Sequence, residues 1–381
     1  MKFQLLLFVL VFLCGCKSES IEQSSKGNYT LNLKTTVRYS IDSQTSPYYL
    51  RHQYLPEEEK LIISNTNKND KSLIELDLVS QKLRRLANTK VEGGDNTLGN
   101  GHFYYHNKDT IFFLGPYNQT LYFTTDSGEI YDQIKFRDAN PDLELGQVHL
   151  LMGTNSGIFD NKELTFVVFP RNLNSRNMKM AVNDPLFGRI NIASRKLSAL
   201  PLKYELDYVQ PVRYPGHLTP IVTSSAEKGI VFTFPTSDKV YWYKNGKLES
   251  KEFKSDYFEK YIHMNDYERI MNFHIEAFQN KKLLYNPKQK RYFMFISLGV
   301  PLVDPDSGSL NDMHSKPFVI LVLDESLDKI SEHRFEASTY NLGCSFISND
   351  ALYLSLNNPN NDNFDEDAFQ YEVYEYAKIS D

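Results

Sequence analysis

Three aspartates in the stretch DPDSGSLND (304–312) form a pattern that could bind a metal ion. Asp304, Asp306 and Asp312 stand at the first, third and ninth positions, where calcium-binding loops place oxygen ligands. The fifth position is Gly308 instead of Asp or Asn, and no turn glycine follows it. A solvated polar turn explains the same residues. We therefore expect no bound cofactor, with calcium at these three carboxylates as the alternative.

Arginine and aromatic residues on two predicted connections could recognise a ligand. Arg171 and Arg176 lie in one of them, and the stretch RYPGH (213–217) begins another. Such side chains bind sugars or peptides by stacking and directed hydrogen bonds, although ordinary surface residues look the same in a sequence. The candidate ligand-binding residues are Arg171, Arg176, Tyr214, His217, Asp304 and Asp306.

The sequence contains none of the standard catalytic motifs of hydrolases, zinc proteases or nucleotide-binding enzymes. His102 and His106 stand four residues apart, but zinc would need a third ligand that the sequence does not reveal. Two carboxylates from distant segments could still cleave a glycoside. We therefore expect no catalysis, and keep a glycan hydrolase or lyase as the alternative.

Two cysteines near the N-terminus stand one residue apart after a short apolar run. The run from Leu5 to Leu13 is far shorter than the ~20 residues that span a bilayer, and it fits the core of a signal peptide. The sequence Leu13-Cys14-Gly15-Cys16 then resembles the lipobox of bacterial lipoprotein signal peptides. This resemblance implies a signal peptide at residues 1–15 and a lipid on Cys16. The alternative is an ordinary secretory signal with a chance cysteine.

Residues 16–28 are polar and are expected to form a flexible tether. Lys17, Glu19 and Glu22 loosely resemble the export signal of surface lipoproteins in Bacteroidetes bacteria. We expect an outer-membrane lipoprotein, and the choice between its periplasmic and cell-surface sides stays open. The remaining thiol, Cys344, lies in an apolar run and is predicted to be a small buried residue.

The bulk composition indicates a β protein that does not bind nucleic acid. The net charge of the 381 residues is −6, whereas binding to phosphate backbones needs a basic surface. The 25 Tyr and 25 Phe residues, interleaved with Val, Ile and Thr, favour strands. No linker rich in Pro, Gly or Ser divides the chain, so residues 29–381 are predicted to form one domain.

Pairs of short alternating segments around tight polar turns recur along the chain. Five such hairpins occupy residues 74–86, 121–134, 188–200, 240–253 and 318–335. Further hairpins precede most of these, at residues 103–114, 221–234, 283–296 and 344–356. Two hairpins make a four-stranded antiparallel sheet, and repeated sheets of this kind indicate a β-propeller.

The count gives five complete units and a sixth of three strands that ends with residues 370–379. The missing strand is predicted at residues 29–40, so pairing of the two chain ends would close a ring of six blades. A seventh blade could be hidden in an insertion. A large β-sandwich is the alternative fold, and it would not require the first and last strands to pair. We expect a monomer.

The lipobox and the hairpin LLYNPKQKRYFMFI (283–296) support a family resemblance. The chain resembles, over nearly its whole length, an uncharacterised family of β-propeller lipoproteins from Bacteroidetes. The resemblance implies the propeller fold and the lipid anchor, and it brings no known catalytic residues.

The longest connections are expected on a single face of the ring. Residues 170–185, 298–317 and 357–369 would follow the second strand of a unit, and residues 88–101, 137–147 and 203–217 would follow the fourth. In an antiparallel sheet these connections leave from the same end, and long loops often bind ligands. We therefore expect an envelope protein, tied to the membrane by its lipid, that binds a protein, peptide or glycan on this face. A structural component of an envelope complex is the other alternative.

Overall fold

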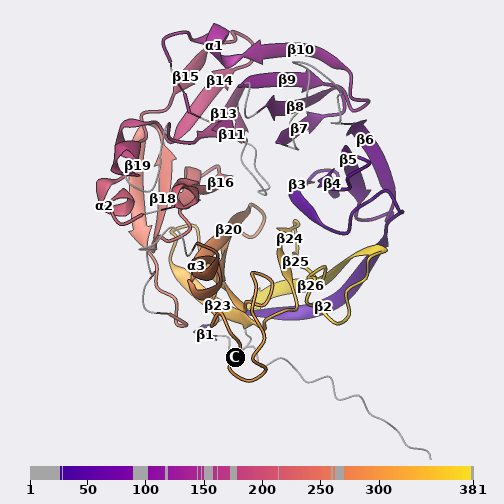
Figure 1. Cartoon of the computed structure of the whole chain (residues 1–381). Helices are drawn as coiled ribbons and strands as arrows, with labels where there is room; N and C mark the ends of the chain where they lie inside the picture. Colours follow the sequence, from indigo (N-terminus) through magenta and orange to yellow (C-terminus); the bar gives the residue numbers. More distant parts are fainter. Residues whose placement is uncertain are drawn as a thin grey trace, which may run out of the picture.

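The computed structural model shows six antiparallel sheets arranged in a ring around a central axis (Figure 1). The structure describes residues 26–27, 29–88, 102–115, 119–143, 145–146, 148–149, 158–160, 162–171, 178–212, 214–258, 261 and 270–378. The predicted six-bladed β-propeller is confirmed, and no seventh sheet occurs among these residues. No helix in the same ranges is long and apolar enough to span a bilayer.

The sheets are called blades 1 to 6 in chain order. Blade 1 contains β3 (Tyr49–Leu55), β4 (Lys60–Asn65), β5 (Ser72–Asp77) and β6 (Leu83–Asn88). Blade 2 contains β7 (Phe103–Asn107), β8 (Thr110–Gly115), β9 (Thr120–Thr124) and β10 (Ile130–Lys135). Blade 3 contains β11 (Val148–His149), β12 (Ile158–Asp160), β13 (Glu163–Val168), β14 (Phe187–Asn191) and β15 (Leu197–Ala199).

Blade 4 contains β16 (Ile221–Ser225), β17 (Gly229–Thr233), β18 (Lys239–Lys244) and β19 (Lys247–Glu252). Blade 5 contains β20 (Gln279–Asn286), β21 (Arg291–Ser297), β22 (Phe318–Leu323), β23 (Lys329–Phe335) and the short β1 (Lys26–Gly27). Blade 6 contains β24 (Asn341–Ile347), β25 (Leu352–Ser355), β26 (Ala368–Lys378) and β2 (Tyr29–Ser40). The short helices are α1 (Phe136–Ala139), η2 (Met178–Asn183), α2 (Leu206–Val209), η3 (Pro215–Leu218) and α3 (Ile270–Glu276).

The strands of each blade differ in burial according to their place in the sheet. Every residue of β22, with the sequence FVILVL, is buried, because the middle strands are covered by a neighbouring blade on both faces. The outer strand β19, with the sequence KLESKE, is almost entirely exposed. Continuous apolar runs therefore mark middle strands, and charged alternating runs mark the outer edge.

The tight turn between β18 and β19 shows how the sequence sets these hairpins. Asn245 and Gly246 have positive φ angles of 52° and 80°. Two consecutive residues with positive φ make a type I′ turn, whose twist matches that of the two strands. Asn-Gly is the residue pair that adopts this turn most readily. The local sequence thus fixes where this hairpin reverses.

The ring is closed by the two ends of the chain. The strand predicted at residues 29–40 is present as β2, and it pairs antiparallel with β26 from Tyr29↔Lys378 to Ser40↔Ala368. This pairing confirms the predicted closure and excludes the alternative β-sandwich. β2 supplies the outer strand that blade 6 otherwise lacks.

A bulge in β2 allows this one strand to pack against two neighbouring blades. The register shifts between Leu33 and Thr35, which reverses the alternation of side chains along the strand. Leu31, before the bulge, packs with residues of blade 5, and Tyr39, after it, packs with residues of blade 1. Closure therefore joins blade 6 to both of its neighbours.

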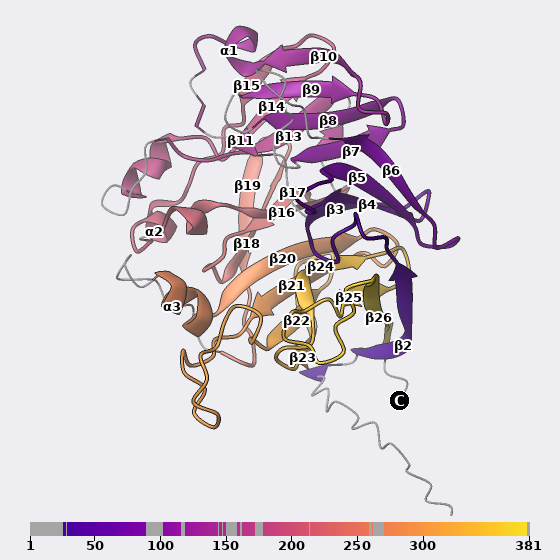
Figure 2. The same ribbon diagram turned by 45° about the vertical axis from the view of Figure 1, so that its right-hand side comes forward.

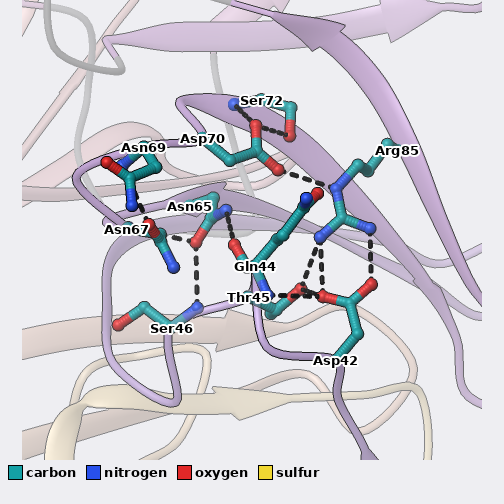
Figure 3. A network of polar contacts seen from close by, with 10 residues as sticks. All are labelled: Asp42, Gln44, Thr45, Ser46, Asn65, Asn67, Asn69, Asp70, Ser72 and Arg85. Carbon is teal, nitrogen blue, oxygen red and sulfur yellow. Dashed lines mark hydrogen bonds and ion pairs between the residues drawn. The ribbon is translucent and has the colours of Figure 1, made fainter.

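Arg85 of β6 fastens the connection between β2 and β3 (Figure 3). Its guanidinium donates to both carboxylate oxygens of Asp42 at 2.7 Å and to Asp70 Oδ2 at 2.7 Å. Hydrogen bonds from Arg85 hold the pKa of the Asp42 carboxyl well below its usual range. Asn65 of blade 1 also binds this connection, because its Oδ1 accepts a hydrogen bond from the Ser46 backbone N–H at 3.0 Å. These bonds attach the closing connection to blade 1.

Two short pairings were not expected from the sequence. In blade 3, both β11 and β12 pair with β13, so the position next to the axis is shared by two short strands. In blade 5, Lys26 and Gly27 form β1 and pair with Glu332 and Ser331 of β23. The chain thus reaches the fold at the outer edge of blade 5. The proposed lipidation site Cys16 and the signal peptide lie outside the described residues.

Replacing Leu31 with Ala should weaken ring closure, whereas Leu33→Ala on the same strand should not. Leu31 is 1% exposed and Leu33 is 53% exposed. We expect Leu31→Ala to lower the free energy of unfolding by about 2–4 kcal/mol, and Leu33→Ala to change it by less than about 0.5 kcal/mol. Urea unfolding followed by circular dichroism measures both. Equal effects of the two substitutions would contradict this account of β2.

Candidate functional site

Each blade runs outward from the axis, and this order determines which connections share a face. β3, β7, β16, β20 and β24 are terminal strands of their sheets and lie toward the axis (Figure 1). Since all neighbouring strands are antiparallel, the connections after the second and fourth strands of each blade leave from one face. We call this the long-loop face. Figure 2 shows α2, α3 and the loop between β21 and β22 together on one side of the ring.

Direct contacts link successive connections of the long-loop face. The ring of Tyr48 stacks on the ring of Phe364, with 5.2 Å between the ring centres, and Asn360 Nδ2 donates to Asp312 Oδ1 at 3.0 Å. Lys316 Nζ donates to Ala277 O at 2.8 Å. The ring centres of His217 and Phe273 lie 5.1 Å apart. On the opposite face the tight turns meet one another. There, Asn286 Nδ2 donates to Ser348 O at 3.1 Å, and Asn349 Nδ2 donates to Pro56 O at 2.9 Å. The predicted separation of long and tight connections is thus present in the described residues.

Tyr214 and His217 come together beside η3, where this helix packs against α3. The Tyr214 ring lies 5.2 Å from the His217 ring and 5.4 Å from the His274 ring. His217 is only 2% exposed, because it also packs against Phe273. Tyr214 is half-buried and is the more accessible of the two predicted residues.

Arg171 lies in the connection between β13 and β14 and is anchored to Asp184. Its Nε is 3.3 Å from Asp184 Oδ1, and its backbone N–H donates to Asp184 Oδ2 at 3.1 Å. The side chain remains 40% exposed at the surface of this connection. Arg176 lies outside the described residues.

The aspartates of residues 304–312 belong to two separate turns of the loop between β21 and β22. Asp304 Oδ1 accepts hydrogen bonds from the backbone N–H groups of Asp306 and Ser307, at 3.0 and 2.7 Å. Asp312 Oδ1 accepts from the His314 N–H at 2.8 Å in the same way. No group of three or more His, Cys, Asp or Glu side chains in the described part of the chain is arranged to hold a metal ion. The expectation of no bound cofactor, with calcium at these carboxylates as its alternative, stays a prediction.

Exposed apolar side chains gather on the long-loop face. Ten large apolar residues are exposed in the described part of the chain, and six of them belong to connections of this face. These six are Met180, Leu206, Met271, Val303, Leu310 and Met313. The other four are Val79 in a turn of the opposite face and Leu33, Tyr131 and Leu248 on outer strands. Among the described residues, most of the exposed large apolar side chains therefore lie on the long-loop face of blades 3 to 5.

A bulge at the start of β20 places a lysine that the sequence analysis did not single out. The register of β20 against β21 shifts between Asn280 and Lys282, which leaves Lys281 as the extra residue. Asn280 is held by blade 4, through a bond from its Nδ2 to Phe234 O at 2.8 Å. Lys282 is held by blade 6, since its Nζ donates to Gly343 O at 3.0 Å and to Ser345 O at 2.7 Å. Lys281 is exposed, unlike both of these neighbours, and stands at the edge of β20 that has no partner strand.

Lys316, at the end of the loop between β21 and β22, adds a third ammonium group. It is 7% exposed, and its Nζ donates to His274 O and Ala277 O, both at 2.8 Å. These carbonyls lie at the C-terminal end of α3, where backbone acceptors lack helical partners and attract cations.

The three lysines are held without a counter-charge. None of them has a carboxylate within 4.0 Å among the residues that the structure describes. Protein atoms around Lys281 displace water and lower its pKa to about 8, although its side chain still reaches solvent, and burial lowers the pKa of Lys282 to about 7. Burial, and next the charge of Lys281, lower the pKa of Lys316 to about 7. Burial thus favours the neutral form of each of these three lysines.

Two histidines lie next to these lysines and are held neutral. Burial and the charge of Lys282 lower the pKa of His52 well below its usual value, and neither of its ring nitrogens has a hydrogen-bond partner among the described residues. Burial, and next the charge of Lys281, lower the pKa of His274, whose Nδ1 lies 3.0 Å from Gln279 Nε2. Neutral imidazoles beside partly charged lysines offer hydrogen bonds but no negative charge. The only sequence signal for this cluster was the adjacent pair of lysines in QNKKLLYN.

Comparisons with known proteins agree with the fold. The family model for a domain of unknown function, DUF4221, matches residues 28–334. A solved DUF4221 protein from Bacteroides vulgatus is 18% identical, with a TM-score of 0.76 over 93% of this chain and all of that one. A protein from Bacteroides fragilis, provisionally described as exported, is 10% identical, with a TM-score of 0.52 over 93% of this chain and 96% of that one. No curated protein matches the chain.

We expect the protein to gain stability between pH 7 and 9, and Lys282→Met should reduce this gain. The unfolded lysine loses its proton near pH 10.4, and the folded one near 7. Unfolding therefore takes up protons in this window, and the folded state gains stability as the pH rises. Of the groups facing Lys282, Cys344 has a pKa raised by burial to about 11, and His52 is already neutral.

We expect the gain in unfolding free energy from pH 7 to 9 to be about 1–2 kcal/mol smaller in Lys282→Met than in the wild type. Urea unfolding at the two pH values measures it. Lys288→Met is the control, because Lys288 is exposed on the opposite face and pairs with Asp350. An unchanged pH dependence in Lys282→Met would show that Lys282 keeps an ordinary pKa.

Proposed function

This chain belongs to the DUF4221 family, whose function is unknown. From the surface of the protein, we propose that it is a lipid-anchored binding protein of the cell envelope. Its ligand is a protein, peptide or glycan that docks on the long-loop face. The observation that carries this proposal is the gathering of six of the ten exposed large apolar side chains on that face. Exposed apolar side chains that share one face are candidates for a binding surface.

The nature of the exposed side chains favours a protein or peptide over a glycan. Three of the six are methionines, namely Met180, Met271 and Met313, and the other three are aliphatic. Methionine adapts its shape to varied apolar partners and is enriched in protein interfaces. Sugars are bound mainly through aromatic stacking, and no Tyr, Phe or Trp is among these six.

The envelope location rests on the lipobox and on one relative. Leu13-Cys14-Gly15-Cys16 has the order of an aliphatic residue, two small residues and an acylated cysteine. The related propeller from Bacteroides fragilis is provisionally described as exported. The proposal places the lipid on Cys16, the residues between Cys16 and β1 (Lys26–Gly27) as a tether, and the propeller at the outer membrane.

Removing the apolar side chains of one long loop should abolish partner binding. The variant Val303→Ser, Leu310→Ser and Met313→Ser changes only exposed residues of the loop between β21 and β22. The matched control, Leu33→Ser, Val79→Ser and Leu248→Ser, removes three exposed apolar groups from other surfaces. Immobilised protein is incubated with envelope extract, and the retained proteins are quantified by mass spectrometry.

We expect the loop variant to retain the specific partner at least about tenfold less than the wild type, which corresponds to ~1.4 kcal/mol. The control should retain it as the wild type does, and both variants should keep the wild-type melting temperature. Equal retention by all three proteins would exclude this loop from the binding site.

Cys16→Ala should release the protein from the membrane, and Cys14→Ala should not. Only Cys16 follows a small residue, Gly15, at the position expected before the cleavage site. Cells labelled with an alkyne fatty acid and separated into membrane and soluble fractions report both acylation and location. Labelling that survives Cys16→Ala, or is lost in Cys14→Ala, would overturn the assignment of the anchor.

A further inference from the structure

We infer that the short tether after Cys16 turns the outer edge of blade 5 toward the bilayer, so that the propeller meets the membrane with one blade edge. The partner of this edge is a lipid surface. The inference rests on the proposed function, because it takes the lipid on Cys16 from it. It adds the orientation in which the long-loop face is presented.

The chain enters the fold at one point on the outer edge of blade 5. The strand β1 pairs there with Glu332 and Ser331 of β23. A single residue separates β1 from β2, which is the outer strand of the neighbouring blade 6. Both strands therefore lie on one side of the ring, and blade 2 lies on the other side (Figure 1).

Side-chain contacts fix this entry point. The Tyr29 ring stacks on the Tyr376 ring of β26, with 5.1 Å between the ring centres. The Arg291 guanidinium of blade 5 lies over the other ring of this pair, 5.9 Å from the centre of Tyr29. The hydroxyl of Tyr376 is 3.2 Å from the Oγ of Ser331, the residue opposite Gly27 in the ladder. The place where the chain joins the propeller is therefore part of the packed fold.

The strand that receives β1 is itself tied to blade 4. Glu332 of β23 is 0% exposed, and its carboxylate accepts hydrogen bonds from the Asp256 backbone N–H at 2.8 Å and from Lys329 Nζ at 3.3 Å. Asp256 belongs to the connection between blades 4 and 5. These bonds keep the outer edge of blade 5 in a fixed position relative to its neighbour.

The tether is short compared with the propeller that it holds. Nine residues separate Cys16 from Lys26, and a fully extended chain of this length spans at most about 35 Å. A compact domain of this size has a radius of gyration of about 20 Å, and the path over its surface from one side to the opposite side is about 80 Å. Blade 2 therefore cannot turn to the bilayer while the lipid of Cys16 stays inserted.

The direction of β1 places the lipid on the side of the long-loop face. β23 is the fourth strand of blade 5 and ends at that face, because the connection after a fourth strand leaves there. β1 runs antiparallel to β23, so Lys26 is nearer to the long-loop face than Gly27 is. The loop between β21 and β22 leaves blade 5 on the same face, and its exposed Val303, Leu310 and Met313 are thereby held close to the membrane.

Energy transfer from a labelled cysteine to lipids of the bilayer tests this orientation. The full-length lipidated protein is reconstituted in phosphatidylcholine vesicles that contain a lipid with an acceptor dye on its headgroup. Arg334→Cys places the donor dye on β23 of blade 5, and Gln133→Cys places it on β10 of blade 2. Both side chains are exposed, whereas Cys344 is buried and does not take up the dye.

We expect energy transfer from Arg334→Cys to exceed that from Gln133→Cys at least about threefold, because the reach of the tether keeps blade 5 near the lipids and blade 2 away from them. Equal transfer from the two positions, or stronger transfer from blade 2, overturns the inference and leaves the anchor of the proposed function intact. A protein that does not stay on the vesicles lacks the lipid, and this result overturns the anchor and the orientation together.

A longer tether provides the matched control. About thirty Gly and Ser residues inserted between Ser20 and Ile21 extend the maximum reach to about 140 Å, and they leave the residues of the propeller unchanged. We expect the difference between the two labelled positions to fall to less than about half, because the propeller can then turn over. A difference of unchanged size would mean that the tether does not set the orientation, which contradicts the inference.

Discussion

The antiparallel pairing of β2 with β26 is the constraint on which the whole ring depends. It joins residues near the two ends of the chain, from Tyr29↔Lys378 to Ser40↔Ala368, and leaves no blade without its outer strand. The bulge after Leu33 lets β2 pack against blade 5 and then against blade 1. Arg85 then ties the connection after β2 to blade 1 through Asp42 and Asp70. Closure is thus distributed over three neighbouring blades.

Closure also determines what the two faces can do. With six blades held in order, every connection after a second or fourth strand emerges on the same side. That side carries the long insertions, the short helices and most of the exposed apolar groups, while the other carries tight turns bound to one another. A surface assembled from several blades in this way can vary in its loops without disturbing the strands beneath. The lysines beside α3 bring a charged group to the inner margin of this apolar surface.

Much of this arrangement could be predicted from the sequence because it depends on local patterns. Alternating hairpins, the Asn-Gly turn at 245–246 and the unpaired strand at 29–40 are each visible in a short stretch, and each is present in the structure. Cys344, predicted as a buried thiol, is 0% exposed. The order of the strands then followed from antiparallel geometry alone.

The candidate site was less accessible to such reasoning because its parts meet only in the folded chain. Lys316 reaches the carbonyls of His274 and Ala277 because a loop folds back onto the end of α3, and no spacing in the sequence signals this. The burial of His217 likewise comes from α3 packing against η3. A one-residue bulge decides that Lys281 is exposed, and sequence patterns of period two do not locate bulges reliably.

The place of β2 at the beginning of the chain has a consequence for biosynthesis. A ribosome makes β2 long before its partner β26, so blade 6 stays incomplete until β26 has been made. Pairing across so many residues carries a large loop-closure entropy, which makes it a late and slow event. Until then both long strands present open edges that can pair with other chains. A cell that makes this protein must therefore keep the open edge of β2 apart from other unfolded chains until β26 has been made.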